Sequence, residues 1–260
     1  MFFKKNKKED SFTPRDLEAF ERKLALHGAM KGEAEGLVKE QKRKRKAAII
    51  TLIILILVLL LWLASYFATQ YGDLVVSVDR SLADCGVVLS ENKEFGETSF
   101  VLDGGKADKV YHFTYDWFES LGVIDDLDQI DGSHNGEDYF AYSFYIRNDG
   151  DKQLEYDAKL VVTGAAKSCD EAARIMVYKN GEPTIYAKPK MGTAEPEPNT
   201  VAFVDGSTVF DNLRENFEPG AVDKYTVVIW FEGNDPECIN DIMGGHMRLS
   251  MLFEAAGLEE

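Results

Sequence analysis

Three cysteines and four histidines are the only residues in this 260-residue sequence suited to thiol or imidazole chemistry. No Cys-x-x-Cys pair and no His-Glu-x-x-His motif is present, so the ligand spacings typical of zinc sites are missing. The Gly-x-Ser-x-Gly turn of serine hydrolases and a glycine-rich phosphate loop are missing too. The sequence therefore leaves an enzyme unsupported, without excluding one.

The three cysteines are Cys85, Cys169 and Cys238, and all of them lie after residue 72. Three thiols allow at most one internal disulfide bond, which an oxidising compartment would permit. Small buried hydrophobic side chains are the equally good alternative. The sequence does not decide between the two.

Charge is absent from Ala47 to Gly72, directly after the basic run Lys42–Lys46. The segment 47–69 has 23 residues, which at about 1.5 Å per residue is enough to cross a hydrocarbon core of about 30 Å. A cleaved signal peptide would have a shorter apolar core within the first 15–30 residues or so. We therefore predict an uncleaved signal anchor, with the aromatic residues near its far end at the membrane interface.

The charge changes sign across this segment. Residues 1–46 carry 14 Lys and Arg against 8 Asp and Glu, whereas the rest of the chain carries 15 against 37. Basic segments stay on the cytoplasmic side, so we predict residues 1–46 inside and 73–260 outside the cell. The basic run is attracted to anionic lipid, and the acidic outer part argues against a nucleic-acid partner.

The segment before the membrane predicts one short helix. Thr13 is a suitable cap, Pro14 suits the first helical position, and the helix is expected to end near His27. Gly32 and Gly36 are expected to interrupt any helix between that point and the basic run.

Residues 73–260 show the period-two alternation of β-strands. The predicted strands are 74–78, 98–102, 109–115, 140–146, 154–162, 174–179, 182–187, 201–204, 225–231 and 247–253. Turn residues 148–151 predict one hairpin, and Asn180-Gly181 predicts a second. Pro183 cannot donate a ladder hydrogen bond, so its strand is expected at a sheet edge.

Helix is scarce in this part, and the best candidate is a turn near Asp170 with Ser168 and Glu171 spaced as a capping box. Short strands separated by Gly, Asn and Asp turns predict an all-β fold. We expect one antiparallel β-sandwich over residues 73–260, of jelly-roll or immunoglobulin-like type.

An acidic stretch, residues 125–137, resembles a calcium loop without matching its spacing. With Asp126 as position 1, Asp128 and Glu137 fall at positions 3 and 12, but position 5 is Ile130. The sequence leaves open a looser calcium site, built from Asp126, Asp128, Asp131 and Glu137, against a solvated acidic turn. No other cofactor is indicated.

A second acidic stretch follows the strongly apolar strand 225–231. Asn234-Asp235-Pro236 predicts a turn. An acidic rim formed by Glu232, Asp235, Glu237 and Asp241 is the alternative, and the turn is favoured.

Three segments, Tyr142–Asn148, Glu171–Gly181 and Tyr225–Cys238, together with the anchor, carry a family resemblance. Over residues 72–254 the chain resembles a group of uncharacterised membrane-anchored proteins of Gram-positive, clostridia-type bacteria. It also resembles, more remotely, camelysin and the fibre-forming biofilm matrix proteins, which implies a jelly-roll sandwich. It departs from those in its long basic N-terminal segment and its uncleaved anchor.

These features together predict a membrane-tethered cell-surface module that binds a surface protein or self-associates. The alternative is an extracellular enzyme similar to a surface metallopeptidase, which scattered carboxylates and the camelysin resemblance support. A sandwich fold hosts many functions and does not itself choose between them.

Overall fold

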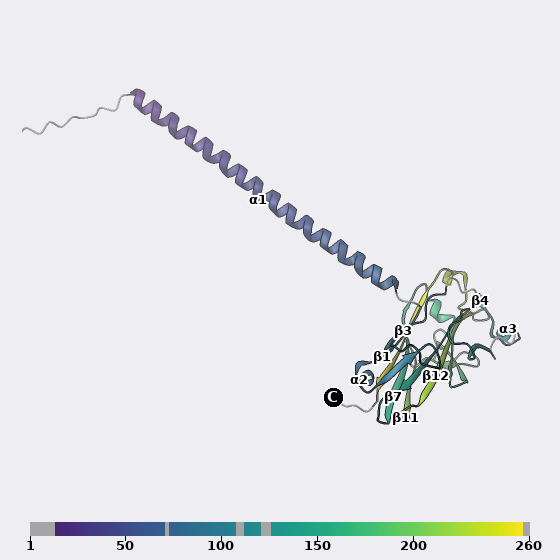
Figure 1. Cartoon of the computed structure of the whole chain (residues 1–260). Coiled ribbons are helices and arrows are strands. Elements are labelled where there is room, and N and C mark those ends of the chain that lie inside the picture. Colours follow the sequence, from purple (N-terminus) through teal and green to yellow (C-terminus); the bar gives the residue numbers. More distant parts are fainter. Residues whose placement is uncertain (1–13, 71–72, 108–111, 121–125, 257–260) are drawn as a thin grey trace, which may run out of the picture. The chain divides into compact units, whose positions relative to one another are not determined.

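The computed structural model describes residues 14–70, 73–107, 112–120 and 126–256. The chain divides into two compact units, Met1–Ala68 and Thr69–Glu260. The first is helical and the second is built of strands (Figure 1).

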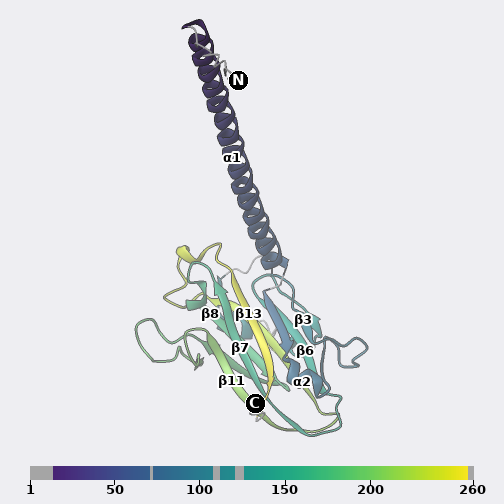
Figure 2. The same cartoon turned by 90° about the vertical axis from the view of Figure 1, so that its left-hand side faces the viewer.

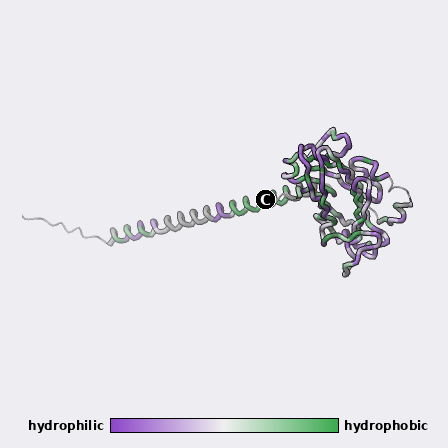
Figure 3. The backbone as a smooth tube through the Cα atoms, turned by 90° about the horizontal axis from the view of Figure 1, so that it is seen from below, coloured by the Kyte–Doolittle hydropathy of each residue, from purple (hydrophilic) through white to green (hydrophobic). Residues whose placement is uncertain are grey.

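Helix α1, Pro14–Gln70, is continuous over 57 residues. The predicted break at Gly32 and Gly36 is therefore wrong. Each glycine costs about 1 kcal/mol in a helix, but the surrounding residues are strong helix formers and include no proline. Within α1, Arg43–Leu63 is long and apolar enough to cross a membrane and has no residue buried inside the protein. Figure 3 shows the C-terminal stretch of α1 as hydrophobic.

The β unit contains two mixed sheets. Sheet A has the order β11-β7-β13-β1-β3. Its strands are β1 Leu74–Val78, β3 Val101–Asp103, β7 Leu154–Ala165, β11 Thr208–Phe217 and β13 Met247–Ala255. Figure 2 shows β7 and β13 side by side. The β1–β13 pair is parallel, so the sheet is not purely antiparallel as predicted.

Sheet B has the order β10-β9-β8-β12-β6-β2, with β4 beside β12 and β5 beside β6. Its strands are β2 Val87–Ser90, β4 His112–Phe113, β5 Gly132–Ser133, β6 Phe140–Asn148, β8 Ala173–Lys179, β9 Glu182–Ala187, β10 Val201–Ala202 and β12 Val222–Glu232. The β9–β10 and β4–β12 pairs are parallel. Part of the predicted strand 109–115 lies outside the described residues.

Short helices join the strands: α2 Arg80–Asp84, α3 Tyr115–Ser120 and the 3₁₀ turns η1 Cys169–Glu171 and η2 Asn240–Ile242. Asp79 caps α2 by accepting a hydrogen bond from the Leu82 N–H at 2.9 Å. The predicted capping box at η1 is wrong. The Ser168 backbone is in the left-handed region, not the extended conformation of a capping residue, and its side chain makes no capping hydrogen bond. Glu171 pairs with Lys188 at 2.8 Å.

The two sheets share one hydrophobic core. Phe144 of β6 packs edge-on against Phe253 of β13, with ring centroids 6.1 Å apart. Tyr156 of β7 and Tyr225 of β12 meet with their hydroxyls 3.1 Å apart. Aromatic contacts of this kind add to the burial that drives the sheets together. The period-two pattern of β1 and β7 correctly predicted which residues face this core.

A second, smaller core lies on the opposite face of sheet B. In β12, Val227 and Ile229 belong to the shared core, whereas Val228 and Trp230 belong to the second one. Helix α3 contributes Phe118 to this outer core. Sheet B is therefore covered on both faces, which explains why β6 is buried almost throughout.

The predicted β6–β7 hairpin is wrong, because β6 belongs to sheet B and β7 to sheet A. Asn148 holds the crossing segment, since its side-chain amide donates to the carbonyls of Lys152 and Phe217. Gly86 packs so closely here that a Cβ atom would lie 2.8 Å from the Gly150 nitrogen. The acidic turn 148–151 thus joins two sheets.

The β8–β9 hairpin is confirmed, and both of its turn residues, Asn180 and Gly181, have positive φ. The edge prediction for β9 holds for only half of the strand. β10 pairs with β9 at Tyr186 and Ala187, whereas Pro183 has no strand beside it other than β8 among the described residues.

Candidate ligand pocket

A pocket of about 450 Å³ opens on the outer side of sheet B. Its walls come from α3, β8, β9, the end of β12, the following turn and the 190–200 loop. They are lined by Tyr115, Asp116, Arg174, Ile185, Lys190, Glu197, Pro198, Asn199, Thr200, Trp230, Glu232, Asn234, Asp235 and Pro236. The volume lies in the range typical of small-molecule sites, about 300–1,000 Å³.

A buried guanidinium lies at the centre of the polar wall. Arg174 is 5% exposed, and its Nη2 lies 2.5 Å from Asp235 Oδ2. The same nitrogen lies 3.6 Å from Glu197 Oε2, beyond hydrogen-bond distance. Burial alone would raise the pKa of Asp235, but hydrogen bonds from Glu237 and Arg174 outweigh it and lower the pKa.

Glu232 is the second buried anion of this wall. It terminates β12, and its carboxylate accepts hydrogen bonds from three N–H groups. The donors are the Trp230 indole at 3.1 Å, the Tyr115 backbone at 3.0 Å and the Asn234 backbone at 3.2 Å. These donors are neutral, so they satisfy the oxygens of Glu232 without cancelling its charge.

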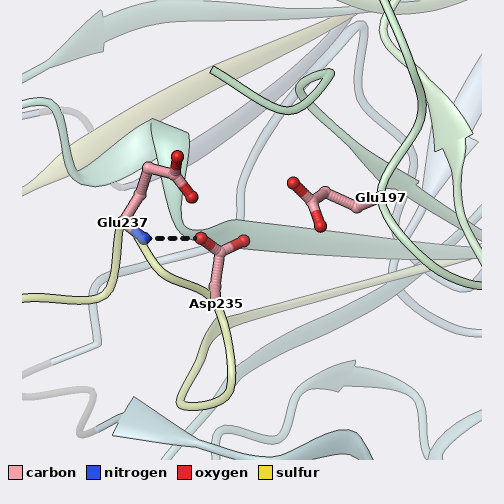
Figure 4. Close-up of side chains that lie close together, drawn as sticks. All are labelled: Glu197, Asp235 and Glu237. Atoms are coloured by element: carbon pink, nitrogen blue, oxygen red, sulfur yellow. Dashed lines mark hydrogen bonds between the residues drawn. The ribbon is translucent and has the colours of Figure 1, made fainter. Parts of the chain in front are cut away.

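Glu197, Asp235 and Glu237 bring carboxylate oxygens within 4.8 Å of one another (Figure 4). The Glu237 N–H donates to Asp235 Oδ1 at 2.9 Å. A hydrogen bond between the carboxyl groups of Glu237 and Asp235, together with burial and repulsion, raises the pKa of Glu237. Among the residues that the structure describes, these three form the group best placed to hold a metal ion.

Another part of the lining is aromatic and apolar. Tyr115 stacks on Trp230 with ring centroids 6.1 Å apart, and Phe118 packs on Trp230 at 5.7 Å. Trp230 is only 1% exposed, so Tyr115 is the ring more accessible to a ligand. The pocket therefore combines a negatively charged wall with an aromatic one.

The predicted calcium residues are arranged differently. Asp128 and Asp131 approach the ammonium of Lys224, which lies 3.9 Å from Asp128 Oδ1 and 3.6 Å from Asp131 Oδ1. Asp128 also accepts a hydrogen bond from Thr226 at 2.7 Å, and Asp131 accepts one from Tyr145 at 2.6 Å. Asp126 and Glu137 are exposed and do not join them in a metal-capable group.

The thiols form no disulfide: Cys85, Cys169 and Cys238 are all free. Burial raises the pKa values of Cys169 and Cys238 and so disfavours their thiolates. His134 has a buried Nε2 without a hydrogen-bond partner, while its Nδ1 lies 2.8 Å from the Gly132 carbonyl. None of these four side chains lines the pocket.

Sequence reasoning identified Glu232, Asp235 and Glu237 as one of two interpretations of their segment, but it missed Arg174 and Glu197. The signal for Arg174 was one charged residue within the otherwise uncharged run 173–178. The signal for Glu197 was weak, because the 191–199 loop is exposed at most of its positions. The favoured turn is present; Glu232 and Asp235 are buried, Glu237 is half-buried, and Asp241 is exposed and does not line the pocket.

No family model matches this chain, and no curated protein matches it. Two crystal structures of β-glucosidase from Kluyveromyces marxianus, one with glucose and one Se-Met labelled, align at TM-scores of 0.22 and 0.21 with 16% and 15% identity. They cover 45% and 44% of this chain, which spans only 12% and 11% of theirs. The N-terminal domain of PorA aligns at 0.24 with 8% identity, covering 65% of this chain and 96% of that one. TM-scores this low establish neither fold nor function.

Proposed function

We propose that this chain is a membrane-tethered cell-surface binding module. The observation that carries the proposal is the joining of an exposed apolar helical segment, Arg43–Leu63, to a compact β unit with a pocket. In this proposal residues 47–69 span the bilayer, 1–46 lie in the cytoplasm and 73–260 lie outside. The β unit is an antiparallel-rich sandwich of jelly-roll or immunoglobulin-like type.

The charge distribution supports this orientation. The basic residues before the span favour the cytoplasmic side, where anionic lipid adds about 1 kcal/mol of attraction per basic residue near the surface. The acidic remainder, with 15 basic against 37 acidic residues, suits a soluble outer domain. The family resemblance over residues 72–254 agrees with a surface protein.

The chemistry of the pocket favours binding over catalysis. Its described lining contains no serine, cysteine or histidine side chain. Arg174 is paired with Asp235, and Glu232 accepts hydrogen bonds from three neutral N–H donors. Such groups fix the orientation of a ligand more readily than they transfer protons.

An extracellular metal-dependent enzyme is the second candidate, and Glu197, Asp235 and Glu237 favour it. An all-carboxylate set suits hard cations such as calcium or magnesium better than zinc. The enzyme of this second candidate would therefore use a hard cation, not the zinc ion of a zinc peptidase. Peptide cleavage by the purified full chain, abolished by a chelator, would establish it over the binding module.

Protease accessibility tests the topology. Protease added to intact, wall-stripped cells should remove residues 73–260 and leave a tag at the N-terminus protected until detergent is added. Protection of the β unit would refute the proposed orientation.

Crosslinking in cells tests the binding role. Partners captured by the full chain, including other copies of it, should disappear when residues 73–260 are deleted and the anchor is kept. Partners retained by the anchor alone would contradict a binding role for the β unit.

A further inference from the structure

Glu197 has a buried carboxylate, 8% exposed, that lines the pocket. Its carboxylate oxygens accept no hydrogen bond from any described residue, and its nearest cation, Arg174 Nη2, is 3.6 Å away. That nitrogen already lies 2.5 Å from Asp235. Glu197 therefore shares its one cation with Asp235 at a distance too long for a hydrogen bond, and a ligand can donate the hydrogen bond that this buried carboxylate lacks.

The charges around Glu197 define what that partner must be. Glu197, Glu232 and Asp235 are each at most 8% exposed, and Arg174 is the one buried cation beside them among the described residues. Lys190 also lines the pocket, but its ammonium lies on the exposed side and pairs with Glu195 at 3.6 Å. The polar wall thus has an excess of buried negative charge, which a positively charged ligand would offset.

The remaining walls favour an organic cation over a bare metal ion. Tyr115, Ile185 and Pro198 present apolar surface, and a tyrosine ring attracts cations through its face. A metal ion held by three carboxylates would leave most of the roughly 450 Å³ unfilled. An alkyl chain that ends in an N–H-rich cation would contact both kinds of wall.

The charge of the whole β unit acts in the same direction. After residue 46 the chain carries 37 acidic against 15 basic residues. A field of this sign raises the local concentration of cations and repels anions.

We infer that this pocket binds a small organic cation carrying an ammonium or guanidinium group on an alkyl chain, with Glu197 as the primary acceptor and Tyr115 beside the chain. The inference rests on the proposed binding function and adds the chemical class of the ligand.

Calorimetric titration of the full chain in detergent micelles tests this directly. The probes are agmatine and cadaverine as cations, 1,5-pentanediol as a neutral analogue, glutarate as an anion, and calcium chloride. The two cations should bind saturably and more weakly as salt increases, while pentanediol and glutarate should not. Equal binding of pentanediol, or calcium binding without amine binding, would overturn the inference.

Two variants and a control locate the site. Glu197→Gln keeps the shape of the side chain and should weaken cation binding at least tenfold, whereas Asp116→Asn, at an exposed lining position, should weaken it by a smaller factor. Glu155→Gln, at an exposed position on β7 outside the lining, should leave the affinity unchanged. Cation binding that is unchanged in both lining variants would refute the assignment of this pocket. If Glu197→Gln failed to fold, unchanged binding by Asp116→Asn would refute it.

Failure of this inference is distinguishable from failure of the proposed function. Suppose that no amine binds, but that protease reaches the β unit and the crosslinked partners depend on it. This result would refute only the proposed class of ligand. Protection of the β unit from added protease would refute the proposed surface module, whatever the titration shows.

Discussion

Two acidic regions of the β unit have opposite arrangements. In the 126–137 turn the acids are close in sequence, and Asp128 and Asp131 approach a lysine, with Asp131 38% exposed. In the pocket the acids come from distant segments, and Asp235 and Glu197 share one arginine with side chains at most 8% exposed. Proximity in sequence produced a turn whose acids are mostly exposed, apart from Asp128, whereas proximity in the fold produced a buried site.

The difference has an electrostatic cause. Water screens the exposed carboxylates of the turn, Asp126, Asp131 and Glu137, whereas Asp128 is 13% exposed and is partly shielded. The pocket excludes most water, and the same charges there interact more strongly and are costlier to leave unpaired. Substitutions in the two regions can show whether burial sets these energies.

The largest effect is expected from Arg174→Met. Removing the guanidinium leaves Glu197 and Asp235 buried without a cation, which typically costs about 3–5 kcal/mol. Thermal unfolding of the full chain in detergent should show a lower Tm, by roughly 2–4 °C per kcal/mol.

Arg80→Met is the matched control for Arg174→Met. Arg80 pairs with Asp84 at 3.9 Å, and its side chain is 94% exposed, so its loss should cost at most about 1 kcal/mol. Equal destabilisation by the two substitutions would show that burial does not distinguish these ion pairs.

Sequence reasoning succeeded where one face of a strand is buried and failed where packing joins distant segments. The alternation of β1 and β7 predicted both the strands and their inward residues. β11 was missed because two register shifts against β7 break its alternation.

The candidate site was harder to predict for the same physical reason. The turn after β12 is local and was predicted. The pairing of Arg174 with Asp235 depends on the β8–β12 register, and the approach of Glu197 depends on the path of the 190–200 loop. Neither is encoded in a short segment, so the buried ion group could not be found from spacing alone.

The next largest effect should come from within the 126–137 turn. Asp128→Ala removes the acceptor of Thr226, which is itself buried and lies 2.6 Å from the Ser143 hydroxyl. Leaving this hydroxyl pair without its acceptor should cost about 1–3 kcal/mol in chemical denaturation.

Asp126→Ala serves as the control in the same turn. Asp126 is exposed, and its loss should change stability by no more than about 0.5 kcal/mol. An equal loss of stability in Asp128→Ala and Asp126→Ala would mean that the hydrogen bond from Thr226 adds nothing to the stability of the fold.

A smaller effect is expected from Lys224→Met. The Lys224 side chain is 16% exposed, but its ion pairs are long, at 3.9 Å and 3.6 Å, so its loss should cost about 1 kcal/mol. It lies where a cation bridging Asp128 and Asp131 would need to bind, so calcium should stabilise the variant more than the wild-type chain. Stronger calcium stabilisation of the wild type, lost in Asp131→Asn, would instead support the loop site predicted from sequence.

The smallest effect concerns Glu237, and it should depend on pH. Its pKa is raised above the ordinary 4.5 because the protonated carboxyl hydrogen-bonds to Asp235. The stabilisation is therefore present below the unfolded pKa and is lost as pH rises through the raised folded value.

The glutamine of the Glu237→Gln variant cannot ionise. The stability of this variant relative to the wild-type chain should therefore increase as pH rises from about 4 to 7. Glu237 is far more exposed than Glu197, so solvent screening should hold the gain below about 1 kcal/mol. Denaturant midpoints at several pH values measure the difference, with Glu195→Gln as an exposed comparison expected to show no such rise. A difference that stays constant with pH would mean that Glu237 and Asp235 do not share a proton, and proton sharing would then not distinguish the buried acids from those of the turn.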